Sequence, residues 1–195
     1  MFDRFLAQLF RVGLLLAAAL LPPQVLRAQQ NLLIDPARSE VHFTLSDVLR
    51  TVHGTFHLKQ GEIAFNRATG QASGSIVVDA LSGQSGNSAR DRRMTNEELK
   101  AQSYKDVTFA PTLFTGEFHS EGDSSLQIHG VLTLLGAAHE IDVPMKVQAN
   151  GNQVHAIGTF AVPYVQWGLK DPSTLMLRVG KEVQIDLSLM GSLQP

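Results

Sequence analysis

The sequence predicts an all-β fold in which eight or nine antiparallel strands close into a barrel, with a short helical insert near one end. Most of the chain after residue 30 alternates apolar and polar residues, which is the period of a strand with one buried face. Short segments rich in turn-forming residues join these stretches, and short connections favour antiparallel pairing. Closure into a barrel removes the exposed sheet edges. A two-sheet sandwich is the competing architecture on this pattern alone.

Nine segments carry the strand pattern. In the first, SEVHFTLS, the apolar residues Val41, Phe43 and Leu45 share one face. Asn150-Gly151, between two later segments, is typical of a tight hairpin turn. The predicted strands are, in chain order, residues 39–46, 51–58, 61–66, 71–80, 106–114, 125–135, 139–150, 153–164 and 181–193.

Residues 1–28 are predicted to be a cleaved signal peptide, which leaves 29–195 as a single domain. Arg4 and Arg11 precede the apolar run 12–21, and the segment ends at the small residue Ala28. The apolar run is half as long as the roughly 20 residues that a membrane-spanning helix needs. An uncleaved anchor is the alternative. The segment therefore predicts export, to the periplasm or out of the cell.

The composition argues against two classes of function. The chain has no cysteine, which excludes disulfides and thiol chemistry. Without residues 1–28 it holds 13 Lys and Arg against 17 Asp and Glu, a net charge of −4. Such a chain has no surplus of basic side chains for a phosphate backbone, so we expect no nucleic-acid partner.

The segment 85–109 interrupts the strand pattern with charged residues. Ser88 followed by Asp91, and Thr95 followed by Glu98, have the form of capping boxes. The predicted helices cover residues 89–94 and 96–102, within an insert of about 88–102. Because these helices carry few apolar residues, we expect them to lie across the end or the flank of the barrel. The insert then either plugs the barrel or forms a lip around the entrance to a cavity.

Four glycines lie within predicted strands, in phase with the apolar residues of those strands. Glycine weakens a strand and leaves space beside it. Two interpretations are compatible with each other: the glycines let the sheet bend sharply, or they widen an apolar cavity. The four residues are Gly54, Gly74, Gly130 and Gly158.

Four motifs, in order along residues 32–192, together resemble the YceI-like family. VHGTFHLKQGEI is similar to the V-x-G-x-F-x-x-x-x-G-x-I signature of that family. GNSARDRRM, followed by Tyr104 and by VTF, resembles its helical segment. GVLTLLGAAHEIDVPM resembles its G-x-L-T hairpin, and VQWGL a late aromatic-glycine motif.

The resemblance implies an extended, lipocalin-like barrel of eight antiparallel strands whose mouth is framed by the insert. It also implies that the lumen holds a long apolar lipid, a polyisoprenoid or an isoprenoid quinone, as cargo and not as a cofactor. The expected function is to sequester or transport this lipid outside the cytoplasm. The expected partners are the lipid itself and, transiently, a membrane or membrane protein that exchanges it. A homodimer is compatible with this interpretation.

The chain departs from the family pattern in the insert. Where the family often has Arg-Asp-x-His-Leu, the sequence reads Arg90-Asp91-Arg92-Arg93-Met94. Asp106 stands where a proline often follows the tyrosine. Because these positions are proposed to meet the ligand, the head-group preference of the family cannot be carried over.

Strand phase and the resemblance together nominate the ligand-binding residues. Arg90, Arg93 and Tyr104 are expected at the mouth. The residues expected to face the apolar lumen are Val41, Phe43, Phe56, Ile63, Phe65, Ile76, Val78, Phe109, Leu132, Ile141, Met145, Phe160 and Trp167.

Two other classes of function compete with the lipid carrier. His53 and His57 have the spacing of a helical zinc motif, but in a strand their rings would lie roughly 13 Å apart. We therefore expect no metal site, and the sequence shows no hydrolase motif, so we expect no enzyme. A periplasmic module for protein–protein interaction or stress protection, without bound lipid, is the alternative; it would use an exposed apolar patch.

Overall fold

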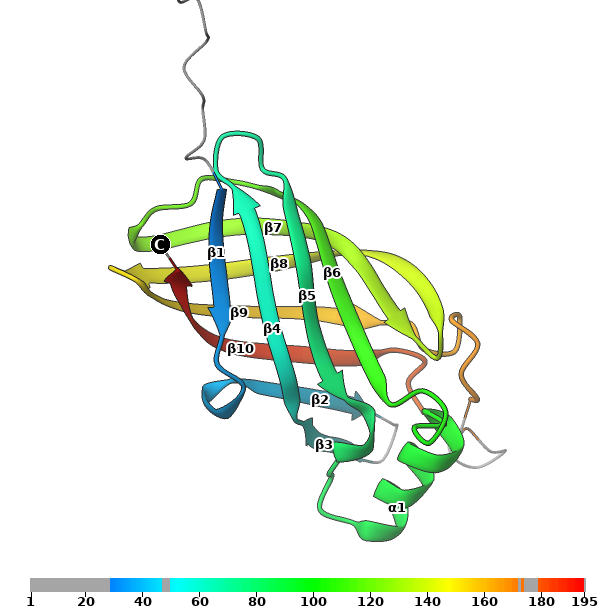
Figure 1. The fold of residues 1–195 in the computed structure, drawn as a ribbon. Helices are drawn as coiled ribbons and strands as arrows, with labels where there is room; N and C mark the ends of the chain where they lie inside the picture. The colour runs from blue at the N-terminus through cyan, green and yellow to red at the C-terminus, as the bar shows by residue number, and fades with distance from the viewer. Residues whose placement is uncertain (1–28, 47–49, 172, 174–178, 195) are drawn as a thin grey trace, which may run out of the picture.

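The computed structural model describes residues 29–46, 50–171, 173 and 179–194. The predicted signal peptide therefore lies outside the described residues. Within them, ten strands form one antiparallel sheet (Figure 1). The strands are β1 (Gln29–Ile34), β2 (Glu40–Ser46), β3 (Thr51–Phe56), β4 (Leu58–Asn66), β5 (Ala72–Asp79), β6 (Asp106–Thr115), β7 (Glu121–Leu134), β8 (Ala137–Asn150), β9 (Gln153–Val162) and β10 (Val183–Gln194).

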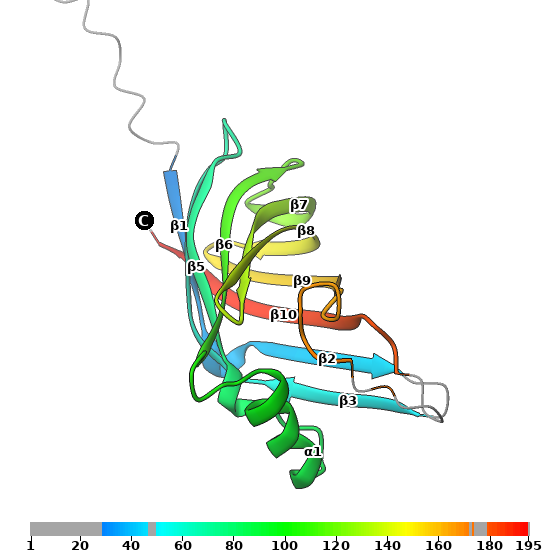
Figure 2. The same cartoon turned by 90° about the vertical axis from the view of Figure 1, so that its right-hand side faces the viewer.

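The sheet closes on itself through β1, which pairs with β4 on one side and with β10 on the other. This closure makes a ring of eight strands in the order β1-β4-β5-β6-β7-β8-β9-β10. β10 is long enough to pair with β1 near its end and with β2 near its start, so β2 and β3 extend the wall beyond β1 and β4 (Figures 1 and 2). The predicted eight-stranded antiparallel barrel is confirmed, and the sandwich is excluded.

The sequence did not predict β1. A short 3-10 helix, η1 (Pro36–Arg38), separates it from β2, and the Asp35 side chain caps this helix by accepting from the Ala37 N–H at 3.0 Å. Proline at the first helical position cannot donate to a strand ladder, so the chain bends there. The bend ends β1 after six residues. Its alternating apolar residues, Leu32 and Ile34, are too few to stand out as a strand in the sequence.

The helical insert is one continuous element and not the two predicted helices. α1 (Ser88–Arg93) runs directly into a π-helical turn, η3 (Met94–Glu98). The cap of α1 is Asn87, which accepts from the N–H groups of residues 89 and 90. Thr95 is buried, and its hydroxyl donates to the Asp91 carbonyl at 2.9 Å. Because this hydroxyl bonds backwards within the helix, Thr95 does not start a new one.

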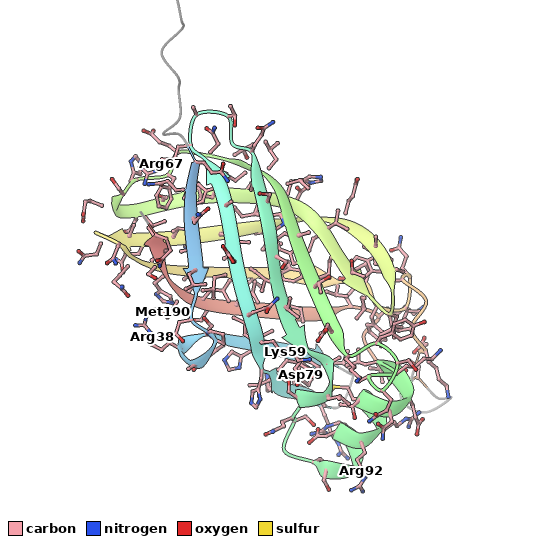
Figure 3. The ribbon with its side chains drawn as sticks, viewed as in Figure 1. Arg38, Lys59, Arg67, Asp79, Arg92 and Met190 are labelled. Atoms are coloured by element: carbon pink, nitrogen blue, oxygen red, sulfur yellow. The ribbon has the colours of Figure 1, made fainter. Side chains whose placement is uncertain are left out.

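A lysine holds together the two ends of the β5–β6 connection (residues 80–105), which contains the insert and the short 3-10 helix η2 (Ala80–Ser82). Asp79 ends β5 and Asp106 begins β6, and the two residues pair across the sheet. The Lys59 ammonium lies 2.5 Å from an Asp106 carboxylate oxygen and 3.6 Å from one of Asp79 (Figure 3). Hydrogen bonding to Asp106 and the charges of both carboxylates raise the pKa of Lys59.

The insert lies at one end of the barrel, near the end of β3 and the start of β6 (Figures 1 and 2). Arg92, on the outer side of α1, points away from the barrel (Figure 3). No helix within the described residues is long and apolar enough to cross a membrane. We call this end of the barrel the insert end.

Candidate ligand-binding cavity

The barrel encloses a cavity of about 750 Å³. Its wall is made almost entirely of apolar side chains that point inward from the strands. Among the described residues, none of the large side chains is completely buried, although many belong to the core. In a filled core, large side chains would have no accessible surface. The small exposure of these side chains therefore indicates that they form a wall, packed on one side and facing the open cavity on the other.

The part of the cavity away from the insert is lined by aliphatic side chains of β8, β9 and β10. Val147, Ala156 and Leu189 line it and belong to one buried cluster. Alternation along β8 explains the pattern, because its inward residues from Val143 onward are buried while their neighbours are exposed. This region can bind only an apolar group.

Three of the four mid-strand glycines let a neighbouring side chain lie against the wall. A Cβ at Gly130 would lie 2.6 Å from the Phe109 ring, and one at Gly54 would lie 2.4 Å from the Phe43 ring. At Gly158 the Met145 sulfur takes the same position, 2.2 Å from a Cβ. The glycines therefore provide space that wall side chains use, which keeps those side chains out of the centre of the cavity.

Gly74 differs from the other three glycines. It is exposed, has φ of +108°, and a Cβ there would lie 2.1 Å from the Glu62 carbonyl oxygen. Such a backbone conformation strongly favours glycine. Gly74 thus serves the bend of β5 and does not widen the cavity.

All the charged residues among the described lining lie at the insert end. They are Arg50, Arg90, Arg93, Glu98 and Lys170. Arg50 precedes β3, and Lys170 belongs to the β9–β10 connection. The cavity is therefore polarised along its length, with an apolar interior and a charged opening, as an amphiphilic ligand requires.

Arg90 is held in place by the backbone before α1. Its Nε donates to the Ser85 hydroxyl oxygen at 2.7 Å, and its Nη2 donates to the Ser85 carbonyl at 2.8 Å. The Ser85 N–H and hydroxyl both donate to the Asp91 carboxylate. The Arg-Asp pair of the sequence motif therefore positions the start of the insert against the cavity.

Tyr164, just beyond β9, is a buried residue of the same end. Its hydroxyl donates to the Gly180 carbonyl at 2.7 Å. Burial, followed by the negative charges of Asp171 and Glu98, raises the pKa of Tyr164 to about 12. Tyr164 is therefore neutral at physiological pH, and its proton is already used in a hydrogen bond.

Twelve of the thirteen residues nominated for the lumen line the cavity, and Trp167 does not. Pro163 ends β9, so the alternation of that strand does not reach Trp167, which lies in the following turn. Its ring stacks on His139 with centroids 4.0 Å apart and planes 6° apart.

Two of the three residues nominated for the mouth, Arg90 and Arg93, line the cavity. Tyr104 does not line it. The side chain of Tyr104 is 41% exposed and lies against Gly136 in the β7–β8 turn. The family motif placed Tyr104 near the insert, but only the tertiary structure shows that its ring lies outside the barrel wall.

The sequence argument missed the residues that complete the insert end. Met94, Glu98 and Leu99 come from the insert, and Tyr164 and Leu169 come from the connection after β9. Strand phase does not apply to these segments. Met94 and Glu98 are four residues apart, about one helical turn, which was a signal that these two residues share one face.

The histidines singled out in the sequence are exposed or contact one polar neighbour each. His53 and His57 are exposed, and His53 lies 3.0 Å from the Thr44 hydroxyl. His129 pairs with Asp142 across β7 and β8 at 2.9 Å. Within the described part of the chain, no group of three or more potential ligands is placed to hold a metal ion.

Comparison with solved structures supports the same architecture. The fold is similar to that of BcnA from Burkholderia cenocepacia, with a TM-score of 0.67 and 20% identity over 80% of this chain and 98% of that one. It is similar to a polyisoprenoid binding domain from Saccharophagus degradans implicated in plant cell wall breakdown, with a TM-score of 0.66 and 16% identity over 84% and 98% of the two chains. It also resembles the YCEI protein of Campylobacter jejuni, with a TM-score of 0.57 and 15% identity over 69% and 81%.

Among curated proteins, no sequence matches this chain. The family model described as a YceI-like domain matches residues 33–190, which is most of the chain and nearly all of the barrel. The family inferred from the motifs is confirmed: this chain belongs to the YceI-like domain family.

Proposed function

We propose that the protein binds a long apolar lipid of the isoprenoid type inside its barrel and carries it through an aqueous compartment outside the cytoplasm. The observation that carries this proposal is the apolar cavity of about 750 Å³, which has charged residues at one end only. A cavity of about 150 Å³ with apolar walls holds one benzene molecule. By that proportion, this cavity has room for roughly 30 carbon atoms, or about six isoprene units.

The energetics support retention by the tail. Burying one five-carbon unit contributes at most about 4 kcal/mol, from roughly 0.8 kcal/mol per methylene group. Association and ordering of the ligand oppose binding by roughly 4–15 kcal/mol. Three or four buried units therefore suffice without a strong polar contact, and the cavity has space for more.

Two further parts of the proposal rest on other observations. Export is supported by the order of basic, apolar and small residues in 1–28. The description of the Saccharophagus degradans relative as a polyisoprenoid binding domain supports the isoprenoid class of cargo. A homodimer remains a prediction.

Native mass spectrometry of the full chain, purified gently from a membrane-containing host, tests the proposal. We expect a stoichiometric adduct, and solvent extraction should release a lipid with a chain of five-carbon units. A protein that is consistently empty would contradict lipid carriage and favour the interaction module.

A matched pair of variants on β9 distinguishes the cavity from the outer surface. Ala156 lines the cavity, whereas its neighbour Ile157 is 43% exposed on the opposite face. We expect Ala156→Phe to lower the bound lipid by about tenfold or more, because the new ring fills the space of the tail. Ile157→Phe should leave it unchanged. A folded Ala156→Phe protein with normal lipid content would contradict binding at this level of the barrel.

A further inference from the structure

Glu98 is the unexplained polar group of the cavity. It ends η3 and lines the insert end, and its side chain is only 18% exposed. Both of its carboxylate oxygens are buried, and neither accepts a hydrogen bond from any residue that the structure describes. The closest cation is Arg93, whose Nε lies 3.9 Å from Oε1, too far for a hydrogen bond.

Two donors of the insert end, Arg90 and Tyr164, already donate elsewhere, and Arg93 lies nearer to another acid than to Glu98. Arg93 Nε lies closer to Glu97, at 3.5 Å. Arg90 donates to Ser85, and the Tyr164 hydroxyl donates to the Gly180 carbonyl. A buried acceptor without a partner lowers stability, and a charged one does so most strongly. Such groups in native proteins call for an explanation, and a ligand that brings its own donor supplies one.

The charges of the insert end select the kind of donor. The lining cations, Arg90, Arg93 and Lys170 among them, disfavour an ammonium group at this position. A phosphate or a carboxylate would meet these cations but would place a second negative charge beside Glu98. A quinone or ester carbonyl only accepts hydrogen bonds and would leave Glu98 without a partner. A hydroxyl group is neutral and donates.

We propose that Glu98 recognises the polar end of the bound lipid by accepting a hydrogen bond from its hydroxyl group, so that the cavity selects long-chain alcohols or phenols over ethers, quinones and phosphates. This inference rests on the proposed function, because it assigns the head group of the same ligand. The apolar tail then extends from the insert end toward Val147 and Ala156.

The experiment measures how lipid-stripped full-length protein binds three probes that share one isoprenoid chain. These are geranylgeraniol, its methyl ether and its monophosphate. We expect the wild type to bind the alcohol about tenfold or more tightly than the ether, as a hydrogen bond to a charged acceptor provides. The phosphate should bind more weakly than the alcohol.

Variants assign the preference to Glu98. In Glu98→Leu the alcohol and the ether should bind equally, with the ether retaining wild-type affinity. Glu98→Gln keeps an acceptor oxygen without the charge and should show a smaller preference. Glu140→Gln is the control, because Glu140 is an exposed acid of β8 that does not line the cavity, and its preference should be unchanged.

The outcomes separate this inference from lipid carriage itself. Equal binding of alcohol and ether to the wild type overturns the role of Glu98 while leaving the carrier function intact. Tightest binding of the phosphate overturns it in favour of the cations. If none of the three probes binds, the proposed function itself fails.

Discussion

Tyr164 lies where the charged end of the cavity meets the core, and its ionisation reports on both. Its pKa is raised to about 12, first by burial and then by the charges of Asp171 and Glu98. The folded protein therefore keeps this phenol protonated above pH 10, where an unfolded tyrosine loses its proton. The stability that follows is complete below pH 10 and is lost as the pH rises through 12.

A near-ultraviolet absorbance titration of phenolate tests this assignment, because the chain has only two tyrosines. We expect an ionisation near pH 12 that is absent from Tyr164→Phe. Glu98→Gln should move that step to lower pH, since it removes one of the negative charges that oppose ionisation. A Tyr164→Phe protein with the same high-pH titration as the wild type would contradict the assignment.

Within single strands, glycine and its neighbours control how wide the cavity is. Gly130 in β7 is paired with Pro111 in β6, and the Phe109 ring covers it. We expect Gly130→Ala to lower the free energy of unfolding by about 1–3 kcal/mol, because the new methyl group would lie 2.6 Å from both the ring and the Ala110 carbonyl oxygen.

Urea unfolding measures this loss. Gln127→Ala is the control, because Gln127 is exposed on the same strand, and we expect it to change stability by no more than about 0.5 kcal/mol. Equal stability of Gly130→Ala and the wild type would contradict close packing between Gly130 and the Phe109 ring.

At the scale of the whole molecule, we propose that cargo enters and leaves the barrel at the insert end. Two exposed apolar side chains, Leu81 and Tyr104, lie in the β5–β6 connection, each 41% exposed. Their neighbours Ala80 and Lys105 are hydrogen-bonded at 3.0 Å, which holds the two ends of the connection together. Exposed apolar residues beside a cavity opening are suited to brief contact with a membrane or a membrane protein.

Transfer of bound lipid to phospholipid vesicles tests this contact. We expect the double variant Leu81→Asp/Tyr104→Asp to transfer lipid about tenfold more slowly. Each substitution removes a large apolar side chain whose burial in the membrane would contribute about 1.5–3 kcal/mol. Ile157→Asp, an equally exposed apolar position on the barrel wall, is the control. Equal rates for all three proteins would place exchange elsewhere.

The local pattern of the sequence determined the strands and most of the cavity wall. Alternation along β2, β4 and β8 correctly placed Phe43, Ile63 and Met145 on the inner face, because successive side chains of any strand point to opposite sides. The same rule failed for Trp167, where a proline ended the strand, and for β1, which η1 separates from the strand that follows.

Only the tertiary structure decided how the insert meets the barrel. The sequence indicated helix in this segment, but Thr95 became buried and bonded backwards, so one helical element formed instead of two. That element brings Glu98 and Leu99 against the cavity while Tyr104 lies outside it. These positions depend on contacts between segments far apart in the chain, such as Tyr104 against Gly136. No local period encodes such contacts, so the charged end of the cavity was fixed by closure of the barrel.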